Sequence, residues 1–113
     1  MGEWPTRIVG SGVVVIRPEG RINMMAAPDL REQLHNLVRD GNTRVVVDLS
    51  GSDSIDSSGL GALISGLKAA RQSGGDLRIA SPGEQAVAVL ELTNLNRVLK
   101  SYDDADSAFD EPA

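Results

Sequence analysis

The sequence contains no cysteine, a single histidine and only three aromatic residues. Without cysteine the chain can form no disulfide bond, no Cys-bound zinc site and no iron–sulfur cluster. Three aromatic side chains are too few to build a stacking platform for single-stranded nucleic acid. We therefore expect no nucleic acid partner of that kind.

Long hydrophobic runs are also missing. The longest apolar run near the amino terminus, Val13 to Ile16, is far too short to cross a bilayer. The residues before it lack the basic start and apolar stretch of an export signal. We expect a cytoplasmic protein that makes no direct contact with a membrane.

The charge of the chain is concentrated at its carboxyl end. In 113 residues, 16 acidic and 11 basic groups give a net charge of −5. Five of the acidic groups lie in the last eleven residues, so the chain up to Tyr102 is neutral. This acidic balance does not suit the phosphate backbone of duplex nucleic acid. We predict a single domain over residues 1–113, with a core at about 6–102 and an acidic carboxy-terminal segment at 103–113.

Alternating hydrophobic patterns predict an α/β fold. Runs of β-branched residues favour strands, and leucines at helical spacing favour amphipathic helices. The predicted strands lie at 6–10, 12–18, 44–49, 77–80 and 98–102. The predicted helices lie at 28–40, 57–73, 81–94 and 104–109, and the third begins with a capping box between Ser81 and Glu84. We expect a mixed, mostly parallel sheet of four to five strands with four helices.

The segment 48–61 is rich in serine, aspartate and glycine. It follows a valine-rich strand and leads into a helix, which is where α/β sheets place ligands. We expect a loop here whose serines and aspartates are not core residues. In the helix that follows, each glycine costs about 1 kcal/mol against alanine, so close packing is the expected compensation. Gly59, Ala62 and Gly66 share one face and form a smooth strip against which another element can lie.

Several enzymatic interpretations of this segment lack a partner residue. A dinucleotide-binding fingerprint would need glycine in place of Ile64, and the Gly-Lys-Ser/Thr of a P-loop is absent. Asp48 has no acidic pair after the first strand, which a phosphoaccepting aspartate requires. Serine hydrolysis needs a general base, and the only histidine, His35, lies in the first helix, where we expect it to face solvent. The aspartates also lack a calcium-loop spacing. We expect no catalytic residue, metal site or cofactor.

Four motifs, in this order, give the chain a resemblance to a known family. They are Gly20-Arg21-Ile22-Asn23, Val45-Val46-Val47-Asp48-Leu49, Ile55-Asp56-Ser57-Ser58-Gly59-Leu60-Gly61 and Gly74-Gly75-Asp76-Leu77. With them the sequence resembles a STAS domain over roughly residues 8–109, and most closely a bacterial anti-sigma factor antagonist. The hydrophobic residue followed by Asp-Ser-Ser-Gly-Leu-Gly after a buried strand is the most specific of the four.

The resemblance implies a partner-switching protein that is not an enzyme. Such antagonists, when unphosphorylated, bind an anti-sigma factor that is also a serine kinase and so release a sigma factor. The kinase phosphorylates the first serine of the motif, which is Ser57 here, within Asp56, Ser58 and Gly59. A metal-dependent serine phosphatase reverses the modification. The residues expected to contact the partner are Asn23, Met24, Met25, Ser54, Ile55, Gly61, Ala62 and Gly66.

Two of these features have alternative interpretations. Ser57 or Asp56 could simply cap the helix, which is compatible with phosphorylation of Ser57. A phosphate there would add about −1.5 to −2 charges beside Asp53 and Asp56, and helix N–H groups could support it. Met24 and Met25 are expected to be partly buried under the helix that follows, as methionine gap-fillers often are. Alternatively, they form an exposed apolar contact for a partner.

Two other roles for a STAS domain stay open. The chain could be an accessory subunit of a membrane transporter complex, because STAS domains also occur there. It could also belong to a large signalling assembly, although such relatives usually carry an additional amino-terminal sensory domain. Nothing in the sequence requires more than a monomer.

Overall fold

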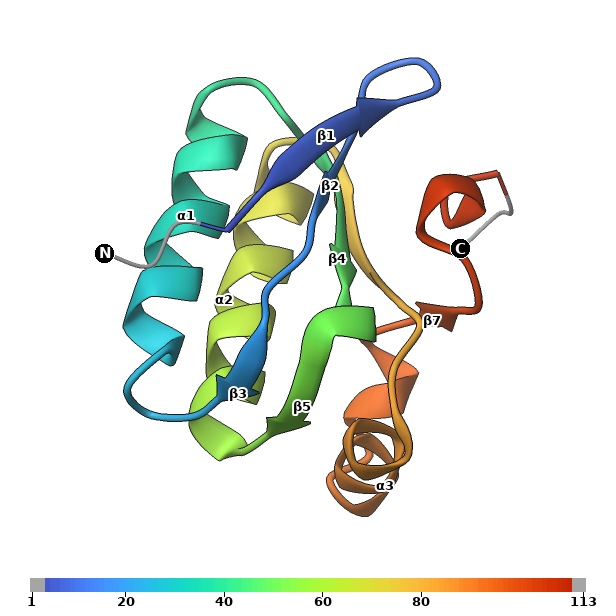
Figure 1. Ribbon diagram of the computed structural model, residues 1–113. Helices are drawn as coiled ribbons and strands as arrows, with labels where there is room; N and C mark the ends of the chain where they lie inside the picture. Colours follow the sequence, from blue (N-terminus) through green and yellow to red (C-terminus); the bar gives the residue numbers. More distant parts are fainter. Residues whose placement is uncertain (1–3, 111–113) are drawn as a thin grey trace.

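The computed structural model of the protein describes residues 4–110, and its elements are labelled in Figure 1. Three α-helices are present in this part of the chain: α1 (Ala27–Arg39), α2 (Ser57–Gln72) and α3 (Glu84–Leu92). The strands are β1 (Thr6–Val9), β2 (Val13–Ile16), β3 (Gly20–Ile22), β4 (Arg44–Asp48), β5 (Ser52–Ile55), β6 (Asp76–Ala80) and β7 (Ser101–Tyr102). Three 3-10 turns complete the list: η1 (Leu49–Gly51), η2 (Leu95–Arg97) and η3 (Ala105–Ser107).

Five strands form the main sheet in the order β1-β2-β4-β6-β7. The pair β1–β2 is antiparallel and every other pair is parallel. The remaining strands, β3 and β5, pair in parallel as a separate two-stranded sheet. This arrangement confirms the predicted α/β fold with a mixed, mostly parallel sheet.

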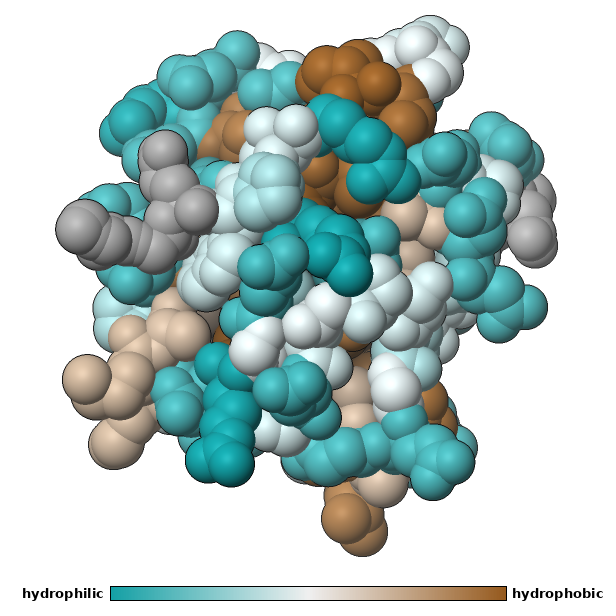
Figure 2. Space-filling model, in the orientation of Figure 1, coloured by the Kyte–Doolittle hydropathy of each residue, from teal (hydrophilic) through white to brown (hydrophobic). Residues whose placement is uncertain are grey.

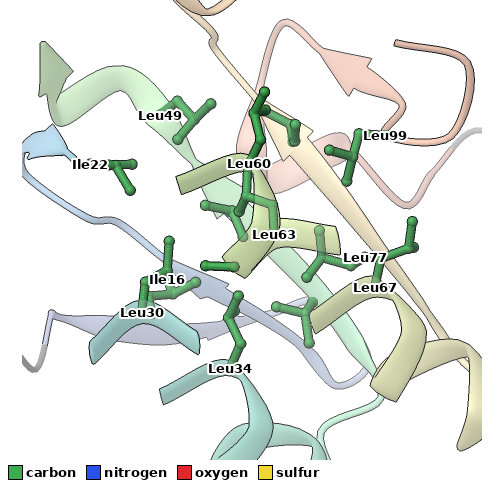
Figure 3. Packing of buried hydrophobic residues seen from close by; sticks show 14 of the residues in the cluster. Ile16, Ile22, Leu30, Leu34, Leu49, Leu60, Leu63, Leu67, Leu77 and Leu99 are labelled. Carbon is green, nitrogen blue, oxygen red and sulfur yellow. The ribbon is translucent and has the colours of Figure 1, made fainter. Parts of the chain in front are cut away.

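The helices α1 and α2 lie side by side on one face of the main sheet (Figure 1). Between helices and sheet, fully buried leucines from α1 and α2 meet Val45 and Val47 of β4. Figure 3 shows part of this cluster, including Leu30 and Leu34 from α1 and Leu63 from α2. Val46, which alternates with these valines, belongs to a second cluster on the opposite face of the sheet. The continuous valine run is therefore buried on both faces, as such a parallel strand should be.

The acidic carboxy-terminal segment covers that opposite face. Ala105 and Ala108 are buried there against the valines of β2 and β4. Arg78 of β6, also buried, donates a hydrogen bond to the carbonyl of Ala108 at 2.8 Å and stacks over the ring of Phe109, 4.2 Å from its centroid. The segment therefore packs on the domain up to residue 110, and residues 111–113 lie outside the described part of the chain.

An exposed ion pair also connects this segment to β1. Arg7 donates a hydrogen bond to the carboxylate of Asp106. That hydrogen bond raises the pKa of Arg7 above its usual value. Both side chains are about half exposed, so the pair contributes little stability compared with the buried alanines.

Two predictions about helices are wrong. The stretch 104–109, predicted as a fourth helix, forms only the 3-10 turn η3. The capping box at Ser81 does not form, because α3 begins at Glu84 with Gly83 as its cap. Ser81 has a φ of +52° and its hydroxyl donates to the carbonyl of Asp103, so this serine serves the carboxy-terminal segment instead.

The segment 48–61 is more ordered than a loop. It contains the turn η1 and the strand β5, which the sequence did not predict, just as it did not predict β3. Asp48 is 8% exposed and accepts a hydrogen bond from the N–H of Ser50 at 3.0 Å, so the expectation that no aspartate here is buried is wrong. The cap that Asp48 provides for η1 explains how a carboxylate is accommodated there.

None of the helices between residues 4 and 110 is both long and apolar enough to span a membrane. His35 lies exposed on α1, as predicted. Its Nε2 atom is 2.7 Å from the hydroxyl of Ser65 on α2, so the histidine bridges the two helices at the surface.

Candidate functional site

Asp56 is the N-cap of α2. Its Oδ1 atom accepts hydrogen bonds from the N–H groups of Ser58 at 2.9 Å and Gly59 at 3.1 Å. Its own backbone N–H donates to the carbonyl of Ile22 in β3 at 3.2 Å, which fixes the turn between β5 and α2. The carboxylate thus satisfies two of the donors that every helix start leaves unpaired.

Ser57 is the first residue of α2 and is exposed. Its hydroxyl makes no hydrogen bond to any residue between 4 and 110, so the cap of this helix is Asp56. That helix N–H groups would support a phosphate on Ser57 stays a prediction. Asp56 already binds the N–H groups of Ser58 and Gly59, so a phosphate would compete with this carboxylate for them and would lie beside it.

The strip of small residues on α2 faces inward. A Cβ atom on Gly59 would lie 2.5 Å from the carbonyl oxygen of Ile22, and one on Gly66 would lie 2.8 Å from Cδ1 of Leu34. Ala62 between them is 3% exposed. Another element does lie against the strip, as predicted, but it is α1 and β3 of this same chain. Gly66 therefore has no surface to offer a partner, and Ala62 almost none.

Ser54 and Ile55, two further predicted contacts, lie on β5. The side chain of Ile55 is 2% exposed and belongs to the core, so its prediction as a partner contact is wrong for the side chain. Ser54 is half-buried and pairs in register with Arg21 of β3. Both line a small hollow toward α3.

Met24 and Met25 protrude from the loop between β3 and α1, with 67% and 80% of their surface exposed. The interpretation that they are buried under α1 is wrong. Asn23 is the physical reason, because its Oδ1 atom accepts the N–H groups of Met25 at 3.0 Å and Ala26 at 3.2 Å. This turn holds the two methionines outward. In Figure 2 an apolar group projects at the lower left, where the loop between β3 and α1 runs in Figure 1.

An open groove of about 620 Å³ connects this loop with the start of α2. Met24, Ser58, Gly61 and Ala62, all predicted from the sequence, line it together. The other lining residues are Ala27, Pro28, Arg31, Glu32 and His35. Sequence reasoning missed the charged side chains of α1. The spacing of Arg31 and His35, four residues apart on one helix face, is the signal that could have found them.

Comparison with known proteins gives this architecture a family. The sequence-family model of the STAS domain matches residues 5–108 of this chain. A predicted anti-sigma factor antagonist of Thermotoga maritima is 34% identical over 109 residues, which cover 96% of both chains. An anti-sigma F factor antagonist of Paenibacillus polymyxa is 25% identical over 101 residues, covering 88% of this chain and 86% of the relative.

Solved structures agree. The crystal structure of a predicted anti-sigma factor antagonist from Thermotoga maritima superimposes with a TM-score of 0.87 at 33% identity, covering 95% of this chain and 92% of that one. The anti-sigma factor antagonist SpoIIAA in its unphosphorylated form gives a TM-score of 0.71 at 18% identity, over 92% and 91% of the two chains, and supports the fold alone. On the family match and the identity along nearly its whole length, the chain belongs to the STAS domain family, among the anti-sigma factor antagonists.

Proposed function

We propose that this chain is a partner switch that, when unphosphorylated, binds an anti-sigma factor with serine kinase activity and so releases a sigma factor. Phosphorylation of Ser57 ends the binding, and a serine/threonine phosphatase restores it. The observation that carries the proposal is the exposed hydroxyl of Ser57, free of hydrogen bonds within the described chain and next to the groove that leads to Met24. Relatives named as antagonists of anti-sigma F and anti-sigma-B factors support the choice of partner.

The surroundings of Ser57 explain why one phosphate would be sufficient to end binding of the partner. A phosphate adds about −1.5 to −2 charges at pH 7. Asp56 already occupies the N–H groups of Ser58 and Gly59, so α2 would compensate the new charge only in part, and that carboxylate would repel it. Partner atoms that approach the groove would have to displace the water around two adjacent anions. The fold itself need not change.

A charge at position 57 is expected to weaken binding at least tenfold. Ser57→Asp introduces the charge, whereas Ser57→Ala removes only the hydroxyl and should keep the affinity within about twofold. Ser50→Asp, at another exposed serine in η1, controls for the added charge itself. The anti-sigma factor recovered with the wild-type chain from its host is titrated against each variant by calorimetry. Tight binding by Ser57→Asp, or recovery of a transporter ATPase in place of an anti-sigma factor, would contradict the proposal.

The exposed methionines provide a second test of the same surface. Met25→Lys replaces an apolar contact by a charge and is expected to reduce the affinity for the anti-sigma factor about tenfold, since interface cores lose most when an apolar anchor becomes charged. Leu92→Lys on α3 is the matched control, because Leu92 is 85% exposed and lies at the end of α3, outside the loop between β3 and α1. Thermal unfolding of both variants should match the wild type. Equal losses of affinity in the two variants would show that the loop is not the docking site.

A further inference from the structure

The strand that leads to Ser57 has one edge that no strand covers. β5 pairs only with β3, in a two-stranded sheet. β3 has three residues, and its register with β5 shifts between Gly20 and Arg21. A pairing this short and irregular holds β5 weakly. Some other contact is needed to fix the last residue of β5 just before the turn at Asp56.

Gln85 of α3 supplies that contact. Its Oε1 atom accepts the backbone N–H of Ile55 at 2.9 Å, and its Nε2 atom donates to the carbonyl of Ile55 at 2.8 Å. A primary amide carries the same donor and acceptor pair as a peptide group, so the side chain acts as a one-residue neighbouring strand. Ile55 lies two positions before Ser57, and the residue between them is the cap of α2.

The position of Ser57 thus depends on both neighbours of β5. From one side, the carbonyl of Ile22 in β3 accepts the N–H of Asp56. From the other side, Gln85 binds both backbone groups of Ile55. The α3 helix that carries Gln85 is itself anchored in the core by Ala86 and Leu90. Through Gln85, the turn that carries Ser57 is therefore held in place by a helix that is anchored in the core.

We propose that Gln85 is a positioning residue for Ser57, which sets the place of the Asp56–Ser57 turn for the partner kinase. This inference rests on the proposed function for its consequence but not for its geometry. Without the two hydrogen bonds, β5 is expected to separate from α3 part of the time, and the turn is expected to move with it. The kinase would then meet Ser57 in the reactive arrangement less often.

The chain contains a matched control at another place. Gln33 of α1 accepts the backbone N–H of Trp4 at 3.0 Å and donates to the carbonyl of Trp4 at 2.9 Å. The pair of hydrogen bonds is the same, but it acts on Trp4, two residues before β1 begins, and not on β5. Gln33→Met and Gln85→Met each keep the length of the side chain and remove both hydrogen bonds. Gln85→Glu keeps an acceptor for the Ile55 N–H but places a carboxylate oxygen against the Ile55 carbonyl in place of the donor, so it should also loosen the contact.

Hydrogen exchange of the chain alone, followed by NMR, tests the geometry. Gln85→Met is expected to speed exchange of the Ile55 N–H at least tenfold and that of Asp56 severalfold, with core amides such as Val46 unchanged. Gln33→Met should speed exchange at Trp4 and leave residues 55–57 as they are. Unchanged exchange at Ile55 in Gln85→Met would overturn the inference, whatever the partner turns out to be.

Phosphorylation measures the consequence. With the kinase recovered from the host, Gln85→Met should be phosphorylated on Ser57 at least fivefold more slowly at saturating kinase, whereas Gln33→Met should match the wild type. Equal rates for the two methionine variants, despite faster exchange at Ile55, would overturn the positioning role. If the wild-type chain is not phosphorylated on Ser57 at all, the proposed function fails, and the positioning role of Gln85 for this kinase fails with it. The exchange data then still decide whether the hydrogen bonds hold β5.

Discussion

Gly59→Ala is expected to lower the free energy of unfolding by about 3 kcal/mol or more, whereas Gly61→Ala is expected to raise it by about 0.5–1 kcal/mol. The two glycines lie two residues apart in the same helix and the same motif. A Cβ atom on Gly59 would lie 2.5 Å from a backbone oxygen and 2.6 Å from Cγ1 of Ile55, closer than any carbon can stay. A Cβ atom on Gly61 meets no atom within 4 Å.

The direction of each effect follows from what can move. The oxygen that Gly59 would strike is the carbonyl of Ile22, which also accepts the N–H of Asp56. Relief of the clash requires β3 and α2 to separate, and this separation would break the hydrogen bond that holds the turn at Ser57. At Gly61 the helix gains only the better propensity of alanine. The glycine of the Asp-Ser-Ser-Gly motif is thus required by packing, next to an aspartate that caps and a serine that is exposed.

Chemical unfolding of both variants beside the wild type measures these differences. Should Gly59→Ala fail to accumulate as folded protein at the growth temperature, the same variant produced at low temperature and the exchange rate of its Asp56 N–H still report the strain. A Gly59→Ala variant as stable as Gly61→Ala would mean that β3 does not pack on α2 as described.

The parts of the fold that the sequence predicted are those with strong and long patterns. The valine run of β4 and the leucine spacing of α1 and α2 arise from burial in the main core, so each pattern reports its own environment directly. Gly41 and Gly74, the residues directly after the predicted helices 28–40 and 57–73, have φ values of +101° and +85°, which favour glycine.

The missed parts depend on contacts that are distant in the sequence. β5 reads Ser-Asp-Ser-Ile, and only Ile55 of its residues is buried, so no hydrophobic alternation marks it as a strand. It exists because β3 and Gln85 bind its backbone. The sequence around Ser81 is typical of a helix cap, but the hydroxyl of Ser81 donates to the carbonyl of Asp103 and does not cap α3. In both cases contacts with residues distant in the sequence decide the local structure, and local propensity does not contain this information.

The candidate site was predicted only in part, because some of its features also depend on contacts that are distant in the sequence. The motif around Ser57 is continuous, so its position before α2 could be predicted from sequence. The inward orientation of Gly59, Ala62 and Gly66 could not, because the spacing gives a shared face without saying what covers it. The outward orientation of Met24 and Met25 is decided by the hydrogen bonds of Asn23, which a pattern of apolar residues does not contain.

Leu34→Ala is expected to lower the free energy of unfolding by about 3 kcal/mol, because Leu34 is fully buried between α1, α2 and the sheet. Gly66→Ala alone is expected to cost about 1–2 kcal/mol, since its new Cβ atom would lie 2.8 Å from Cδ1 of Leu34. These two changes concern the same contact between α1 and α2. They should therefore not be additive.

In the Leu34→Ala background the atom that Gly66→Ala would strike is absent. The added methyl group then occupies part of the cavity, and alanine improves the helix propensity of α2 at this position. Cδ1 of Leu77 at 3.1 Å and Cβ of residue 34 at 3.2 Å still border the new atom, so the fit is close but within a few tenths of an ångström of normal contact. We expect the second change to be neutral or favourable in this background, and the double variant to lose at least about 1 kcal/mol less than the sum of the single variants.

A double-mutant cycle from denaturant unfolding of the four proteins measures this coupling. The matched control is Gly61→Ala in the Leu34→Ala background, which is the same type of substitution on α2. Ala62, on the strip itself, cannot serve as the control because it is already an alanine. Position 61 faces the groove and not Leu34, and the two changes there should add within about 0.5 kcal/mol. Additive losses for Leu34 and Gly66 would show that α1 does not lie against the strip, and a free strip would again be available to a partner. Coupling at Gly66 with additivity at Gly61 would assign the inward face of α2 to the fold, so that the partner must bind at the groove and the methionine loop.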